Sequence, residues 1–121
     1  MNKHLHLIVR AEVTNPPKCP EETNIWLLDL IKALGMKVMM GPFAKYCEME
    51  GNRGLTAAAI IETSHVVLHA WDEESPSMLQ LDVYTCSDLM PDVIFDAIQQ
   101  FGPVHIDYKF LNREEKFIEV L

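Results

Sequence analysis

A serine next to a histidine, with a second histidine four residues further on, is the part of the sequence best suited to chemistry. These residues are Ser64, His65 and His69, and Trp71 follows in the same segment. A hydroxyl beside imidazoles can support nucleophilic and acid–base catalysis. No nucleophile-elbow motif of glycines brackets Ser64, so the sequence does not indicate a serine hydrolase of that type.

A second group of reactive side chains follows at the spacing of a β-strand. Side chains alternate between the two faces of a strand, so His65, His69 and Trp71 share a face. In the next segment the residues that share a face are Gln80, Asp82, Tyr84 and Cys86. A solvated sheet face with histidines and a tyrosine is ordinary in itself. The mixture of a hydroxyl, imidazoles, a carboxylate and a thiol favours a functional site.

Pairing these two segments as a hairpin predicts a single polar face. A slip by one residue would bury the carboxylate of the second segment among leucines, so the two polar sets must coincide. Two registers satisfy this condition: His65 opposite Cys86 with His69 opposite Asp82, or His65 opposite Tyr84 with His69 opposite Gln80. Both lead us to expect that the polar side chains gather beside Ser64.

The elements that must position these side chains can be outlined from periodicity. Apolar residues alternate with polar ones through residues 5–13 and 104–110, which predicts two strands. Apolar residues at helical spacing predict helices over residues 20–34 and 91–102. Further strands are expected at residues 36–40 and 79–85, with a β-rich segment over residues 55–71 and a loop over residues 46–53.

The resulting order, β-α-β-β-β-β-α-β, predicts an α+β fold. Few βα units alternate, so a parallel sheet is not required. We expect a two-layer α/β sandwich whose mostly antiparallel sheet is covered on one face by two helices, which leaves the other face for water, a partner chain or a site. A chain of 121 residues is long enough for one domain, spanning residues 1–121.

Composition restricts the partners and the compartment. The 18 acidic and 10 basic residues give a net charge of −8, which disfavours nucleic acid and anionic membrane surfaces. No signal-peptide pattern or membrane-spanning apolar run is present, so a cytoplasmic protein is expected. Three cysteines without metal-type spacing indicate neither a disulfide framework nor a zinc site, and no metal is predicted.

Two stretches, residues 54–73 and 81–86, resemble the core of the short bacterial and archaeal S-adenosylmethionine decarboxylases. The specific features are the serine–histidine pair, the second histidine, the tryptophan and the downstream Thr85-Cys86. The resemblance implies an enzyme made as a proenzyme that cuts itself. The predicted cleavage is at Thr63–Ser64, which would give residues 1–63 and 64–121, with a covalent pyruvoyl cofactor derived from Ser64.

The same resemblance implies roles for individual residues. Thr56 would stabilise the oxyanion of the processing step, and His69 would remove the Cα proton. The pyruvoyl carbonyl would bind the substrate amine as a Schiff base and accept electrons during decarboxylation. Cys86 would then return a proton to the substrate carbon. The implied substrate-binding residues are Glu73, Trp71 and Tyr46.

The implied reaction is decarboxylation of S-adenosylmethionine, which supplies the aminopropyl donor for spermidine synthesis. The chain departs from the family at Thr63, where glutamate is common, at Thr56, where serine is usual, and in extra residues at 48–53. A basic amino acid such as ornithine or arginine is therefore an alternative substrate, and an unprocessed, non-catalytic binding or regulatory homologue is another alternative. A homodimer or higher homo-oligomer is expected, because one sheet face is left half-covered and the family builds its sites at chain interfaces.

Overall fold

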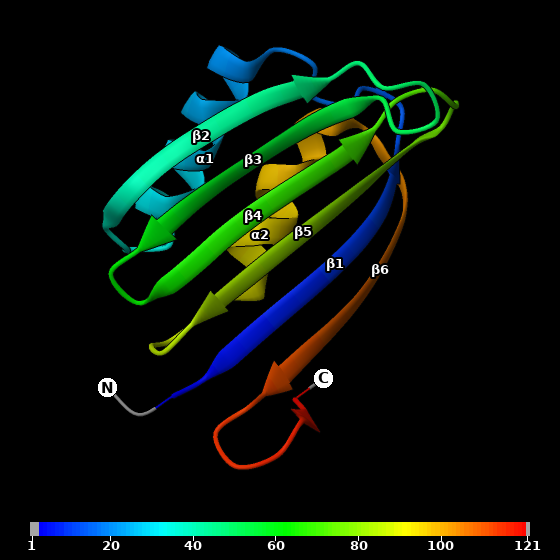
Figure 1. Ribbon diagram of the computed structural model, residues 1–121. Helices are drawn as coiled ribbons and strands as arrows, with labels where there is room; N and C mark the ends of the chain where they lie inside the picture. The colour runs from blue at the N-terminus through cyan, green and yellow to red at the C-terminus, as the bar shows by residue number, and fades with distance from the viewer. Residues whose placement is uncertain (1–2, 121) are drawn as a thin grey trace.

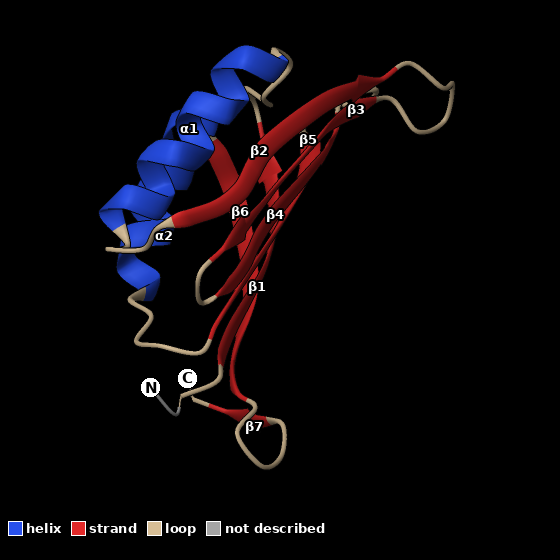
Figure 2. Cartoon of the chain, turned by 60° about the vertical axis from the view of Figure 1, so that its left-hand side comes forward, coloured by secondary structure: helices blue, strands red, loops and turns tan. Residues whose placement is uncertain are grey.

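Seven strands form one antiparallel sheet, and two helices pack against one of its faces (Figures 1 and 2). This computed structural model describes residues 3–120. The strands are β1 (Leu5–Val13), β2 (Val38–Cys47), β3 (Gly54–Ile61), β4 (Ser64–Trp71), β5 (Ser77–Thr85), β6 (Pro103–Asn112) and β7 (Ile118–Glu119). The helices are α1 (Pro20–Ala33) and α2 (Pro91–Ile98), the latter followed by a 3₁₀ turn at Gln99–Phe101. The fold class predicted from the sequence is confirmed.

The spatial order of the strands differs from their order in the chain. The sheet runs β2-β3-β4-β5-β1-β6-β7, so the N-terminal strand lies between β5 and β6 in the interior of the sheet (Figure 1). Both helices lie on the same side of the sheet, as Figure 2 shows in edge view. No helix among residues 3–120 is long and apolar enough to span a membrane.

Period-two alternation decides which face of each strand meets the helices. The buried strand residues on that face include Leu7 and Val9 in β1, Leu68 in β4 and Leu81 in β5, each no more than 1% exposed. The helices contribute buried apolar side chains: Trp26, Leu27, Leu30 and Ile31 from α1, and Ile94 and Ile98 from α2. The opposite face, which we call the open face, carries the polar set.

Two boundaries differ from the sequence-based expectation. The strand expected at residues 36–40 continues to Cys47, because β2 pairs with β3 as far as the Cys47–Gly54 partners. Tyr46 therefore lies in a strand rather than in the expected loop. The β-rich segment 55–71 divides at Glu62 and Thr63 into β3 and β4, which form a hairpin in which Ile61 is paired with Ser64. The short β7 was not expected.

Candidate active site

The β4–β5 hairpin adopts one of the two registers that the sequence allowed. His65 is paired with Tyr84, and His69 is paired with Gln80. The polar sets of both strands therefore share the open face, as predicted. A hollow of about 210 Å³ lies on this face, and its lining includes His65, His69 and Asp82.

The peptide bond between Thr63 and Ser64 lies at the tip of the β3–β4 hairpin in an unusual environment. Ser64 has a φ of 142°, the one positive φ outside glycine among residues 3–120. An L-residue adopts such a conformation only at a cost that surrounding contacts must offset. The carbonyl oxygen of Thr63 accepts a hydrogen bond from the backbone N–H of Cys86 at 2.8 Å. The Thr63 hydroxyl is buried without a hydrogen-bond partner.

Cys86 lies beside this peptide bond because β5 ends one residue earlier. Thr85, the last residue of β5, is paired with Ser64, the first residue of β4. The next residue along the chain is Cys86, which is half-buried and has a free thiol. Of the residues predicted to act in catalysis, Cys86 is the one that the structure brings next to Ser64.

Thr56 and His69 form a second group in the middle of the sheet. Their Oγ1 and Nδ1 atoms are 3.0 Å apart, and the two residues are paired across β3 and β4. His69 follows Ser64 by five positions in the same strand. A strand rises about 3.3 Å per residue, so the two Cα atoms are separated by roughly 16 Å. The expectation that His69 lies beside Ser64 of its own chain is wrong.

The predicted substrate-binding residues lie at the far end of β4. Trp71 follows Ser64 by seven positions, which corresponds to roughly 23 Å. The expectation that the indole gathers beside Ser64 is therefore also wrong for the single chain. Trp71 and Glu73 border a wide hollow of about 1030 Å³ at this end of the open face, together with Arg10, Glu12 and Gly51.

Residues 51–53 form hydrogen bonds with the residues at this end of the site. The carboxylate of Glu73 accepts hydrogen bonds from the backbone N–H groups of Gly51 at 2.9 Å and Arg53 at 3.3 Å. These two bonds, that from Gly51 first, lower the pKa of Glu73 from its usual value of 4.5. The indole N–H of Trp71 donates to the side-chain oxygen of Asn52 at 2.8 Å.

Tyr46 is separated from the other predicted residues by the sheet. It is paired with the buried Leu55 and packs against the core, on the face that meets the helices. Its hydroxyl donates to the carboxylate of Asp72 at 2.8 Å, and this bond is the main cause that raises the pKa of Tyr46. The structure does not bring Tyr46 to the open face.

Two residues that the sequence did not single out contact Asp82 and Tyr84 on the open face. The Nε2 atom of His6 is 2.7 Å from Oδ1 of Asp82, and the guanidinium of Arg113 lies 4.3 Å from the centre of the Tyr84 ring. The alternation through residues 5–13 puts His6 on the polar side of its strand. His6 lies next to Asp82 because β1 pairs with β5, and local periodicity does not predict that pairing.

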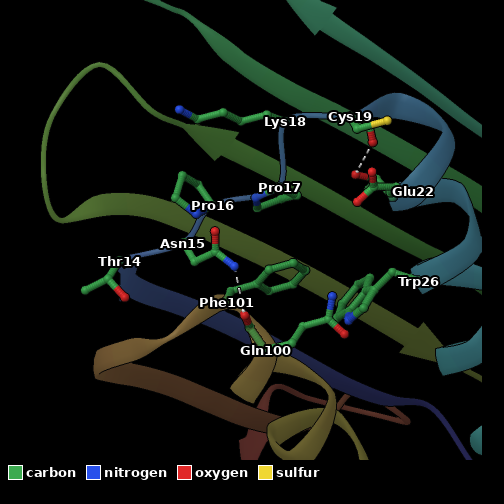
Figure 3. Close-up of a pocket in the computed structure, with 11 residues that line it drawn as sticks. Thr14, Asn15, Pro16, Pro17, Lys18, Cys19, Glu22, Trp26, Gln100 and Phe101 are labelled. Carbon is green, nitrogen blue, oxygen red and sulfur yellow. Dashed lines mark hydrogen bonds between the residues drawn. The ribbon is translucent and has the colours of Figure 1, made fainter.

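A further hollow lies away from all of these groups. Figure 3 shows this hollow of about 370 Å³, where the segment after β1 meets the start of α1 and the 3₁₀ turn. Its lining includes Asn15, Lys18, Glu22, Trp26 and Phe101. None of the predicted site residues borders it, so the candidate site remains the open face.

Comparison with known proteins places this geometry in a family. The family model described as S-adenosylmethionine decarboxylase matches residues 6–114. The S-adenosylmethionine decarboxylase proenzyme of Pyrobaculum arsenaticum is 36% identical over 64 residues, which are 51% of this chain and 50% of that protein. The proenzyme of Pyrobaculum aerophilum is 37% identical over 62 residues, 50% of this chain and 48% of that protein. The chain thus spans about half the length of the curated relatives it matches.

A solved structure supports the fold. The crystal structure of the adenosylmethionine decarboxylase from Aquifex aeolicus superposes with a TM-score of 0.68 over 99% of this chain and 96% of that one, at 23% identity. At this identity the similarity establishes the shared architecture. The match of the family model over residues 6–114 establishes more: the chain belongs to the S-adenosylmethionine decarboxylase family.

Proposed function

We propose that this protein is a self-processing, pyruvoyl-dependent decarboxylase that acts on S-adenosylmethionine. The observation that carries the proposal is the environment of the Thr63–Ser64 peptide bond. Its carbonyl is polarised by the N–H of Cys86, and the residue that follows it has a strained φ of 142°. Both features favour attack on the carbonyl carbon, since one stabilises the developing oxyanion and the other is relieved when the peptide bond is lost.

Self-cleavage needs one water molecule and no other co-reactant. The Ser64 Oγ attacks the Thr63 carbonyl carbon, the C–N bond breaks, and the amide becomes an ester. Removal of the Ser64 Cα proton then breaks the bond between Cβ and Oγ of Ser64, which releases Thr63 as a carboxylate and leaves a dehydroalanine. Addition of water and loss of ammonia convert that residue to the pyruvoyl group. In this scheme the Cys86 N–H is the oxyanion donor within the chain.

The pyruvoyl group supplies an electron sink for the loss of carbon dioxide. The chain's own contribution to that step is a proton donor close to residue 64, and Cys86 has the thiol and the position for this role. Glu73 and Trp71 carry a carboxylate and an indole suited to the ribose hydroxyls and the adenine ring of the substrate. In the free chain both are hydrogen-bonded to the 51–53 segment, so substrate would have to exchange with these contacts.

We further propose that the working unit is a homodimer or higher homo-oligomer whose open faces meet. Within one chain Thr56 and His69 are too far from Ser64 to act on it. Two open faces related by a twofold axis would bring the middle of one β4 over the end of the other. Exposed apolar side chains on this face would be covered: Ile8 is 41% exposed, Phe43 67% and Ile60 41%.

Two measurements test the function. Intact-mass spectrometry of the purified protein should find two species that correspond to residues 1–63 and 64–121. The cleaved protein should release carbon dioxide from S-adenosylmethionine, and not from ornithine or arginine. A chain that stays whole after long incubation would favour the non-catalytic homologue, whereas activity on a basic amino acid would favour that substrate class. A cytoplasmic location and supply of the aminopropyl donor for spermidine synthesis remain proposals that rest on the sequence and the family resemblance.

A further inference from the structure

Three potential metal ligands converge on the open face near the start of β4. They are His6 from β1, His65 from β4 and Asp82 from β5, whose ligand atoms all lie within 4.8 Å of one another. The Nε2 atoms of His6 and His65 are 2.7 Å and 3.1 Å from the same oxygen, Oδ1 of Asp82. Three adjacent strands supply these side chains, so the sheet itself fixes their spacing.

The geometry is close to that of a coordinated ion. Zinc–nitrogen and zinc–oxygen bonds are about 2.0–2.2 Å long, so donors around a tetrahedral ion lie about 3.3 Å apart. The His65–Asp82 distance of 3.1 Å is close to this spacing, and the His6–Asp82 distance of 2.7 Å is about 0.6 Å shorter, so His6 would have to move outward slightly to admit an ion. The side chain of His6 is 13% exposed, that of His65 37% and that of Asp82 41%. The cluster is therefore partly shielded and open on one side.

We propose that His6, His65 and Asp82 bind a divalent transition-metal ion of the zinc class, through two Nε2 atoms and one carboxylate oxygen. Two imidazoles and a carboxylate suit zinc, cobalt, nickel or iron better than magnesium or calcium, which prefer all-oxygen sites. Three protein ligands leave a coordination position for water or another small ligand on the open side.

The contact between Arg113 and His6 competes with binding of the ion, and this competition can be tested. Its Nη1 atom donates to Nδ1 of His6 at 3.1 Å. Because a guanidinium only donates, Nδ1 must accept, and the His6 proton lies on Nε2, pointing at Asp82. A metal ion on Nε2 would move that proton to Nδ1 and displace Arg113. The ion and the Arg113 contact are therefore mutually exclusive.

The ligands also come from both sides of the Thr63–Ser64 bond. His6 belongs to residues 1–63, while His65 and Asp82 belong to residues 64–121. The β1–β5 pairing joins the two parts, so the site does not depend on whether the chain is cut. The proposal therefore stands or fails separately from the proposed function.

Zinc binding to untagged protein measures the site directly. Isothermal titration with Zn²⁺, checked by metal analysis after dialysis, should give one ion per chain. Asp82→Asn and His6→Asn should each weaken binding by more than the roughly 10–100-fold typical of an outer-shell change. Asp107→Asn is the matched control: Asp107 forms a similar pair with His105 at 3.2 Å on an exposed surface, outside the cluster, and its loss should leave binding unchanged.

The Arg113→Ala variant should change zinc affinity in the opposite direction, which loss of folding would not do. Removal of the competing contact should tighten zinc binding, by about tenfold if it matches an outer-shell effect. Circular dichroism of each variant checks folding, and Asp82→Asn keeps the shape of the side chain in case His6→Asn is unstable. Absence of zinc binding in the wild type, or binding that survives Asp82→Asn, would overturn the proposal. Loss of binding in Cys86→Ser but not in Asp82→Asn would assign the ion to the thiol and would also overturn it.

Discussion

The backbone N–H of Cys86 donates to the carbonyl oxygen of Thr63 at 2.8 Å. This one bond links the end of β5 to the turn before β4 and holds the carbonyl that the Ser64 hydroxyl would attack. It also holds Cys86, which has a free thiol, next to the peptide bond whose second residue would become the cofactor. Two roles assigned to different stages of the reaction, oxyanion stabilisation and later proton donation, thus meet at a single residue.

The Ser64→Ala variant should remain one uncut chain without decarboxylase activity, because the attacking oxygen is lost. Ser87→Ala is the matched control, since Ser87 carries a nearby hydroxyl that is bonded to Thr85. It should be cut at the wild-type rate. Intact-mass spectrometry distinguishes the products, and a Ser64→Ala chain that is still cut between residues 63 and 64 would rule out this chemistry.

Co-expression of two inactive variants tests whether sites are shared between chains. Ser64→Ala and His69→Ala should each stay uncut alone, but in a mixed oligomer the His69→Ala chain should be cut, because its Ser64 meets His69 of the other copy. Co-expression of Thr56→Ala with His69→Ala should show no such rescue. Thr56 and His69 of one chain act together on Ser64 of the other, so each Ser64 would still lack one of the two. Failure of rescue in a purified mixed oligomer would place the whole site within one chain.

Cys86→Ala should still be cut, because the alanine retains the backbone N–H that contacts Thr63. Decarboxylation should then fall by the roughly 10²–10⁴-fold typical of a lost general acid. Misdirected protonation should convert the pyruvoyl group to alanine, so activity should decay during turnover while a mass gain appears on the fragment that begins at residue 64. Wild-type turnover without inactivation would show that the thiol only packs.

The 51–53 segment should loosen in acid. Hydrogen bonds from Gly51 and Arg53 lower the pKa of Glu73 below 4.5, so its stabilising effect is fully present above that value and is lost as the pH falls through the lowered pKa. Amide resonances of Gly51 and Arg53 should shift in that acid range, and the shift should be absent in Glu73→Gln. An acid transition that persists in Glu73→Gln would assign it to another carboxylate.

Gly54→Ala should destabilise the fold strongly. Gly54 has a φ of 152°, and an added Cβ would lie 1.7 Å from the backbone oxygen of Ala70, which the β3–β4 pairing holds in place. Gly35→Ala is the matched control, because Gly35 has a φ of 73° with no atom within 4 Å of an added Cβ. Its cost should be the roughly 1–2 kcal/mol of the left-handed conformation. Urea unfolding should show a clearly larger decrease in the free energy of unfolding for Gly54→Ala than for Gly35→Ala. Equal decreases would contradict the predicted clash with Ala70.

Local periodicity determined much of this protein from the sequence alone. Alternation assigned His65 and His69 to one face and Val66 and Leu68 to the other, because the side-chain period of a strand is two. The need to keep Asp82 out of the core reduced the β4–β5 register to two choices, and the structure adopts one of them. The helices and the two-layer architecture followed from the same patterns.

Tertiary structure alone decided which of these groups meet. Insertion of β1 between β5 and β6 brings His6 and Arg113 to Asp82 and Tyr84, and no local pattern specifies a pairing between strands so distant in the chain. The hairpin turn at Glu62 and Thr63 fixes where β4 begins, and with it the distance that separates Ser64 from His69. Side chains on one face of a strand are collinear rather than clustered, because each residue advances the chain by about 3.3 Å.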